Sequence, residues 1–265
     1  MKREYTYSSF EEDLVENAGQ DFSLPENYRY IRDRFWERHY GRLLYYIFGL
    51  IGQIYWRIFL RAHFIGVEKL SSFPRDKGYF IYANHTQPFG DPMLAIAIGA
   101  SLKVRRRNRA IGSPANFGLP VLGPLFPAMG GIPTASDREG LKKMEEAISY
   151  YVRKAQPVVI FPEAHVWPYY TGIRPFGTVS FHYPVKENLP CFAMTVCYTK
   201  AKSGQKPLAK IYIDGPFYPD ESVPLKQRKA YLCEKVRAAM LHRSSESDYE
   251  YVTYTKKRWP QRRIK

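Results

Sequence analysis

The chain has 265 residues, of which 45% are hydrophobic, so it can bury one substantial core and is not a disordered tail. Lys and Arg outnumber Asp and Glu by 40 to 25, a formal charge of +15 that predicts an acidic partner: nucleic acid, an anionic membrane or a phosphorylated substrate. The three cysteines, Cys191, Cys197 and Cys233, lack metal-ligand spacing, which argues against a disulfide scaffold or structural zinc and indicates a reduced, cytosol-facing protein.

The N-terminal segment, residues 1–30, is polar and carries seven acidic side chains. It has no apolar stretch of the kind that a cleavable signal peptide needs, and we expect a flexible acidic lead-in.

Residues 31–62 form the one membrane candidate, centred on the apolar stretch Leu43–Leu60. This stretch is near the lower limit for a spanning helix and is interrupted by polar side chains. At helical spacing one side collects small and polar residues, while aliphatic and aromatic residues cover the rest: Gly49, Gly52, Gln53 and Arg57. We expect a helix embedded in one leaflet or at the membrane interface, with the small, polar side facing protein; an ordinary buried core helix is the alternative.

Residues 63–245 have the pattern of one α/β domain, and residues 246–265 form a basic tail. We predict a mixed, mostly buried sheet flanked by helices. Short apolar runs indicate the strands: Tyr79–Ala83, Pro157–Phe161, Cys191–Tyr198 and Lys210–Asp214. Capping residues and helical spacing indicate the helices: Asp91–Leu102, Arg138–Gln156 and Leu225–Leu241. The stretch Gly112–Pro133 is rich in Pro and Gly and predicts a folded loop.

A histidine and an aspartate flank the turn that follows the first expected strand. Asn84 and His85 come directly after Tyr79–Ala83, and Asp91 opens the next helix. A carboxylate that folds back across a turn can fix one imidazole nitrogen and leave the other free to accept a proton from a hydroxyl. The alternatives are that Asp91 only caps its helix and that His85 is structural.

A second polar segment follows the next strand, and with it the sequence resembles the lysophospholipid acyltransferase family, typified by 1-acylglycerol-3-phosphate acyltransferases. The resemblance covers roughly 130 residues, and several short motifs in order are more specific than any one of them. The matching segments are Gly66-Val67-Glu68-Lys69-Leu70, similar to the entry strand and turn; Asn84-His85 with Asp91, similar to NHxxxxD; Gly131-Ile132-Pro133, similar to the second block; Phe161-Pro162-Glu163-Ala164, similar to FPEG; and Pro175-Phe176-Gly177, similar to PFKxG.

The resemblance implies direct acyl transfer without a covalent enzyme intermediate. His85 would be the general base, Asp91 would orient it, and Glu163 would bind or position the acceptor. Backbone amides near Gly131 could steady the developing oxyanion. The other positions that it implies for substrate binding are Asn84, Ile132, Pro133, Phe161, Pro162 and Ala164. It implies no cofactor and no metal, an acyl-CoA or acyl-carrier protein donor, and a lysophospholipid acceptor, above all 1-acylglycerol-3-phosphate, which would give phosphatidic acid.

Three departures from the family pattern concern the turn and the phosphate-binding arginines. Five residues separate His85 from Asp91, one more than in the family, so the turn must bulge. The arginine that ends the second block is absent, and His165-Val166 replaces the Thr-Arg that follows FPEG. We expect three side chains to take over phosphate binding, unless they are solvated surface groups: Arg138, His165 and Arg174.

The sequence gives less support to two other kinds of active site. A metal site built from His85, Asp91, Glu163 and His165 lacks a compact ligand motif. A Cys-His nucleophile is disfavoured because Cys191 and Cys197 lie in an apolar strand, where they are expected to pack on one face.

Two basic clusters fit a membrane partner. Lys103–Arg109 follows the helix after the catalytic turn, and residues 256–265 hold six positive charges. Both could attract anionic lipid head groups, CoA phosphates or acidic carrier protein, or could be solvated faces. A nucleic-acid-binding protein is the rival interpretation, although no helix-turn-helix, RNP-like or zinc-finger pattern is present. A catalytically inactive lipid-binding relative is a third. We expect a membrane-associated protein on the cytoplasmic face.

Overall fold

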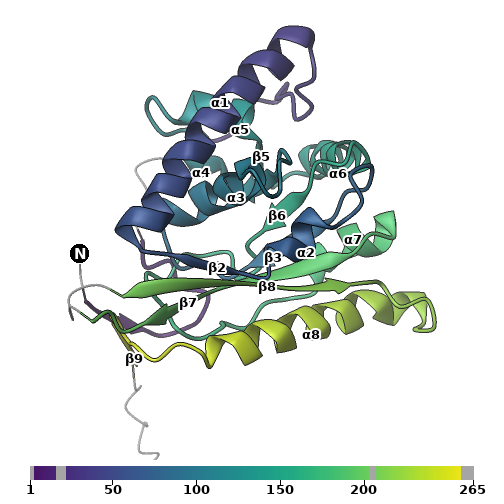
Figure 1. Ribbon diagram of the computed structural model, residues 1–265. Helices are drawn as coiled ribbons and strands as arrows, with labels where there is room; N and C mark the ends of the chain where they lie inside the picture. The colour runs from purple at the N-terminus through teal and green to yellow at the C-terminus, as the bar shows by residue number, and fades with distance from the viewer. Residues whose placement is uncertain (1–2, 16–21, 203–206, 258–265) are drawn as a thin grey trace, which may run out of the picture.

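A computed structural model describes residues 3–15, 22–202 and 207–257. Its centre is a seven-stranded sheet in the order β2-β8-β7-β3-β6-β4-β5 (Figure 1). The strands are β2 (His63–Ile65), β3 (Phe80–Ala83), β4 (Arg109–Gly112), β5 (Gly131–Pro133), β6 (Val158–Ile160), β7 (Cys191–Thr199) and β8 (Leu208–Phe217).

The sheet is mixed. β7, β3, β6, β4 and β5 run parallel, β8 is antiparallel to β7, and β2 is parallel to β8. The sequence-based prediction of a mixed, mostly buried sheet flanked by helices is therefore confirmed. Each of the four predicted strands is present, whereas the prediction did not identify β2, β4 and β5 as strands. β2, β4 and β5 are short, and each contains His, Arg, Gly or Pro, so none is a continuous apolar run of the kind that identified β3 and β6.

Helices cover both faces of the sheet (Figure 1). They are α1 (Phe35–Ile54), continued by the π-helical turn η1 (Tyr55–Phe59), α2 (Glu68–Ser71), α3 (Gly90–Ala100), α4 (Pro114–Phe117), η2 (Gly123–Leu125), α5 (Phe126–Met129), α6 (Arg138–Arg153), η3 (Val179–Phe181), α7 (His182–Glu187) and α8 (Leu225–Ser244). The three predicted helices of the domain correspond to α3, α6 and α8.

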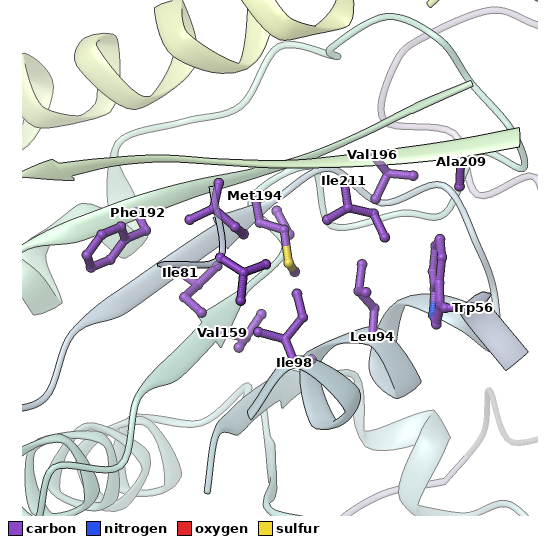
Figure 2. Packing of buried hydrophobic residues seen from close by; sticks show 14 of the residues in the cluster. Trp56, Ile81, Leu94, Ile98, Val159, Phe192, Met194, Val196, Ala209 and Ile211 are labelled. Carbon is purple, nitrogen blue, oxygen red and sulfur yellow. The ribbon is translucent and has the colours of Figure 1, made fainter. Parts of the chain in front are cut away.

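Two hydrophobic cores lie on the two faces. On one face, Leu94 and Ile98 of α3 and Trp56 of η1 pack against Ile81, Met194 and other apolar side chains of the central strands (Figure 2). On the other face, α6, α7 and α8 pack against the opposite side chains of β3, β6 and β7. Because β3 and β7 are buried on both sides, their sequences are continuously apolar rather than alternating.

Helix α1 has two different sides. Its glycines face α3: a Cβ at Gly49 would lie 2.3 Å from the Cβ of Ala100, and one at Gly52 would lie 2.8 Å from the carbonyl oxygen of Met93. Only glycine, which lacks a Cβ, allows α1 and α3 to approach each other so closely. At Gly49 and Gly52 the small side of the helix therefore faces protein, as expected. Arg57, however, is exposed, so its expected place on that side is wrong.

The other side of α1 and η1 is apolar and exposed. Its side chains are Phe35, Trp36, Tyr40, Leu43, Tyr46, Ile47, Leu50, Ile51, Ile54, Ile58 and Phe59, called here the apolar face of α1. The alternative of a fully buried core helix is therefore wrong. Within the described residues, no helix combines the length and the hydropathy needed to cross a membrane.

The two ends of the described chain meet. β1 (Glu4–Tyr7) pairs in parallel with β9 (Thr253–Lys256) in a separate two-stranded sheet (Figure 1). The flexible lead-in expected over residues 1–30 thus contains a strand, and so does the expected basic tail. Because this pairing joins positions about 250 residues apart in the chain, no local sequence pattern predicts it. Residues 258–265 of the tail lie outside the described part.

Two of the five cations in the basic cluster Lys103–Arg109 are structural. Arg106 is buried and donates to the carbonyls of Phe73 and Lys77. Arg109 is buried over the ring of Tyr151, 3.7 Å from its centroid, and burial lowers the pKa of this guanidinium to about 10. These two arginines are unavailable to lipid phosphates, which corrects the expectation that the whole cluster attracts anionic head groups.

Candidate active site

Two segments of the expected site meet at one edge of the sheet. His85 follows β3 and Glu163 follows β6, which are neighbouring parallel strands. Because parallel strands end at the same edge, their following loops meet there. The pairing of β3 with both β6 and β7 places His85 near the centre of this edge.

His85 and Asp91 form the pair that the turn predicts. His85 Nδ1 lies 2.7 Å from Asp91 Oδ2, and the same oxygen accepts hydrogen bonds from the backbone N–H groups of Thr86 at 2.7 Å and Gln87 at 2.8 Å. The Asp91 side chain is fully buried, while that of His85 is 14% exposed. With Nδ1 held by the carboxylate, Nε2 is the ring nitrogen that can accept a proton from a hydroxyl.

Aromatic and polar neighbours hold the turn between β3 and α3, the candidate catalytic turn. The ring of Phe161 stacks on His85 with centroids 4.5 Å apart. Behind the turn, the buried hydroxyl of Tyr198 bonds to Thr86 Oγ1 at 2.8 Å and accepts from Gln87 Nε2 at 2.9 Å. Thr86 and Gln87 are part of the turn that is one residue longer than the family's, and both are anchored.

Asn84 is occupied by structural bonds. Its amide nitrogen donates to the carbonyl of Val196 at 3.0 Å, and its amide oxygen accepts from Val196 N–H at 2.8 Å. It therefore ties the end of β3 to β7. The structure gives Asn84 a supporting place beside the site rather than the substrate contact that we expected.

Glu163 and Arg174 form a buried ion pair. Arg174 Nη2 lies 3.1 Å from Glu163 Oε2, and each side chain is 1% exposed. Glu163 also accepts from the backbone N–H groups of His85 at 3.2 Å and Arg174 at 2.9 Å. Burial raises the pKa of the Glu163 carboxyl, and the charge and hydrogen bonds of Arg174 oppose that rise.

Arg174 is therefore placed differently from the expected phosphate holder. Besides Glu163, its guanidinium donates to the carbonyl oxygens of His165 and Phe10, the latter at 3.2 Å. A buried guanidinium with these partners cannot turn to a lipid phosphate without leaving Glu163 uncompensated. The expectation for Arg174 is corrected: it orients Glu163.

The other two candidates for phosphate binding remain partly open. His165 is half-exposed, and its Nδ1 lies 3.6 Å from Asp13 Oδ2. Arg138 is exposed at the first turn of α6.

Ala164, where the family has glycine, adopts φ 63°, a left-handed conformation that glycine adopts at lower cost. Pro162 is half-buried in the same loop.

The segment Gly131–Pro133 is the edge strand β5, separated from β3 by β6 and β4. Ile132 lies in the core with α6. This places the amides near Gly131 about 14 Å from the line of β3, at the usual spacing of about 4.8 Å between strands. The geometry does not bring them to His85.

These features match known proteins at the levels of family and fold. The family model described as Acyltransferase matches residues 64–196, half of the chain. The chain belongs to the Acyltransferase family. It is also similar to a solved structure, the 1-acyl-sn-glycerophosphate acyltransferase PlsC from Thermotoga maritima, with 17% identity, a TM-score of 0.55 and coverage of 87% of this chain and 86% of that one. No curated protein matches the chain.

The acyltransferase also carries site-edge residues that we did not predict. The buried residues Trp167 and Tyr169 donate from their backbone N–H groups to the carbonyls of His85 and Thr86, at 3.0 and 2.9 Å. The sequence feature that could have indicated these residues is the aromatic run after His165, from Trp167 to Tyr170. Its register against the catalytic turn is a tertiary property that spacing does not reveal.

Metal-binding and cysteine chemistry receive no support from the described residues. Within them no group of three or more His, Cys, Asp or Glu side chains could hold a metal ion. The three cysteines are buried and free, and burial raises the pKa of Cys197 to about 12 and that of Cys233 to about 11. Thiols so disfavoured as thiolates are packing groups.

Proposed function

We propose that this acyltransferase moves a fatty acyl group from acyl-CoA or acyl-carrier protein to the hydroxyl of a lysophospholipid. Its leading acceptor is 1-acylglycerol-3-phosphate, and the product is then phosphatidic acid. The observation that carries the proposal is the His85–Asp91 pair, buried on the aspartate side and open on the imidazole side, at the carboxyl edge of the sheet.

His85 is the general base of the proposed reaction. Its Nε2 takes the proton of the acceptor hydroxyl as the oxygen attacks the thioester carbonyl carbon. The carbon–sulfur bond then breaks, and the thiol of the donor leaves with a proton returned from the imidazolium. Asp91, held by two backbone N–H groups, keeps Nδ1 protonated and stabilises the positive charge while it exists.

Of the three cations expected to bind the acceptor phosphate, Arg138 is the most exposed. Arg174 is committed to Glu163, and His165 lies beside Asp13, whereas Arg138 is exposed at the carboxyl edge. Arg138 follows β5, which runs parallel to β3, so Arg138 and His85 lie at the same edge of the sheet, with β6 and β4 between their strands. We therefore propose Arg138 as the side chain that binds the acceptor phosphate.

We also propose that the enzyme works on an anionic membrane, at its cytoplasmic face, docked through the apolar face of α1. Ordinary soluble proteins seldom expose a contiguous apolar strip of this kind. Phe89, in the turn that follows His85, is also exposed, and the carbonyl of the next residue, Gly90, accepts a hydrogen bond from Trp56 of η1 at 2.9 Å, so this turn lies beside η1. Acyl chains in the bilayer would thus lie next to His85.

One assay tests the reaction. Purified protein in detergent is offered a panel of lysolipids with acyl-CoA or with acyl-carrier protein, and the products are identified by mass. We expect a diacyl product that requires a lysophospholipid and is lost in His85→Ala. A panel without any acylated product would contradict the proposed function.

Liposome flotation tests the membrane. We expect binding that rises with anionic lipid, falls with salt and drops when Leu50 and Ile54 are both changed to Ser. As a control, Leu141→Ser removes an exposed leucine from α6 on the other face of the sheet and should float like the wild type. Tight binding to duplex or single-stranded nucleic acid without flotation would favour the rival interpretation.

A further inference from the structure

A cluster of aromatic side chains joins both ends of the chain to the loop that follows Glu163. The indole of Trp167 is fully buried and stacks on the ring of Tyr254 in β9, with centroids 5.0 Å apart and planes 10° from parallel. Tyr7 of β1 meets the indole edge-on at 4.7 Å. The two strands of the terminal sheet therefore hold one side chain between them.

Polar contacts fix the same indole and its loop. Trp167 Nε1 donates to the carbonyl of Glu12 at 3.0 Å. The hydroxyl of Tyr254 donates to the carbonyl of Pro168 at 2.6 Å. Arg174, the partner of Glu163, donates to the carbonyl of Phe10 at 3.2 Å. Three independent contacts thus anchor the loop to the segments that flank β1 and to β9.

The backbone of this loop is bonded directly to the catalytic turn. Trp167 N–H donates to the carbonyl of His85 at 3.0 Å, and Tyr169 N–H donates to that of Thr86 at 2.9 Å. On its other side, His85 N–H donates to Glu163 at 3.2 Å. The backbone of His85 is therefore clamped by the loop through both its N–H and its C=O.

We propose that Trp167, held by the two terminal strands, is a positioning residue that sets the place of His85 for acyl transfer. This inference rests on the proposed function, in which His85 is the base. The two strands of the terminal sheet lie outside residues 64–196, the region that the family model matches. Displacing a catalytic group by about 1 Å can cost on the order of 100-fold in rate, which makes a distant clamp consequential.

Steady-state kinetics in detergent separate positioning from substrate binding. For Trp167→Ala we expect kcat to fall roughly 10- to 100-fold, with KM for acceptor and donor each within about twofold. Tyr254→Ala removes the stacked ring at the far end of the chain and should lower kcat roughly 3- to 10-fold. Tyr254→Phe keeps that ring and should restore most of the lost turnover.

A control and a second readout keep the test decisive. Phe73→Leu also trims a buried aromatic ring, but near the amino end of β3, and should lower the melting temperature without changing kcat of the folded protein. Hydrogen exchange reports the turn itself: the amides of Thr86 and Gln87, which donate to Asp91, should exchange faster in Trp167→Ala and Tyr254→Ala than in Phe73→Leu.

The outcomes are distinguishable. Unchanged kcat and unchanged exchange at Thr86 and Gln87, in folded Tyr254→Ala and Trp167→Ala, would overturn the positioning role. If Trp167→Ala does not fold, Tyr254→Ala with its Phe rescue decides. If the wild-type protein transfers no acyl group, the proposed function fails, and the exchange data alone then decide whether the terminal strands hold the turn.

Discussion

Each of the two loops at the carboxyl edge holds a pair of ionisable side chains, and the two pairs differ in their exposure to solvent. In the turn after β3, Asp91 is fully buried but its partner His85 reaches solvent, whereas in the loop after β6 both Glu163 and Arg174 are buried. The first pair can exchange a proton with a substrate, and the second cannot do so without opening the protein. By its exposure, His85–Asp91 is the pair suited to the proposed proton transfer and is called here the chemical pair, whereas the buried ion pair Glu163–Arg174 is called the structural pair.

We expect the largest effect when the chemical pair is broken. His85→Ala should lower turnover by roughly 10²–10⁴-fold, the usual loss for a general base, while the melting temperature stays close to that of the wild type. The measurement is kcat with matched thermal melts. Turnover near the wild-type value would show that the pair is not the chemical one.

Breaking the structural pair should have the opposite profile. Glu163→Gln leaves the Arg174 guanidinium buried without a countercharge, which costs about 3–5 kcal/mol of unfolding free energy. Chemical denaturation measures this loss. Glu163→Gln with Arg174→Met removes both charges and serves as the control, with a smaller loss than the single variant. A single variant as stable as the wild type would contradict the assignment.

The pH dependence of stability sharpens the same contrast. Burial raises the pKa of the Glu163 carboxyl, and Arg174 opposes the rise. Arg174→Met removes the charge and the side-chain hydrogen bond that oppose the rise, and leaves only the backbone N–H groups of residues 85 and 174 as donors. The folded state then binds the proton more tightly than the unfolded state does. Stability is then retained at low pH and lost as the pH rises through the folded pKa.

We therefore expect Arg174→Met to be destabilised more at pH 8 than at pH 5, by about 1–3 kcal/mol. Denaturation at the two pH values measures the difference, relative to the wild type. In the double variant with Glu163→Gln the pH dependence should disappear, because the titrating carboxyl is absent. A loss in Arg174→Met that is equal at both pH values would contradict the raised pKa of Glu163.

The two loops also differ in how far sequence alone predicts them. His85 and Asp91 are six positions apart, and a turn between a strand and a helix brings them together by local geometry, so their 2.7 Å contact was predictable. The partner of Arg174 was not. Ten residues of irregular loop separate it from Glu163, and its guanidinium also donates to the carbonyl of Phe10, which lies more than 150 residues away in the chain.

The fold was predictable where the strands form continuous apolar runs, and less so elsewhere. β3 and β7 are such runs, whereas β4 and β5 are short and contain Arg, Gly or Pro. The terminal pairing of β1 with β9 depends on contacts between the two ends of the chain, and short polar and aromatic stretches do not specify such partners.

The smallest expected effect concerns the phosphate site that the structural pair leaves open. Because Arg174 is committed to Glu163, we expect Arg138→Ala to raise KM for a phosphate-bearing lysolipid about fivefold, with kcat and the KM for the donor unchanged. The effect is modest because Arg138 is exposed and its charge is screened by solvent. Lys142→Ala, an exposed cation one turn further along α6, is the matched control and should change neither KM. Equal effects of the two variants would reduce Arg138 to general surface charge, and a rise in the donor KM would place it at the CoA or carrier-protein side instead.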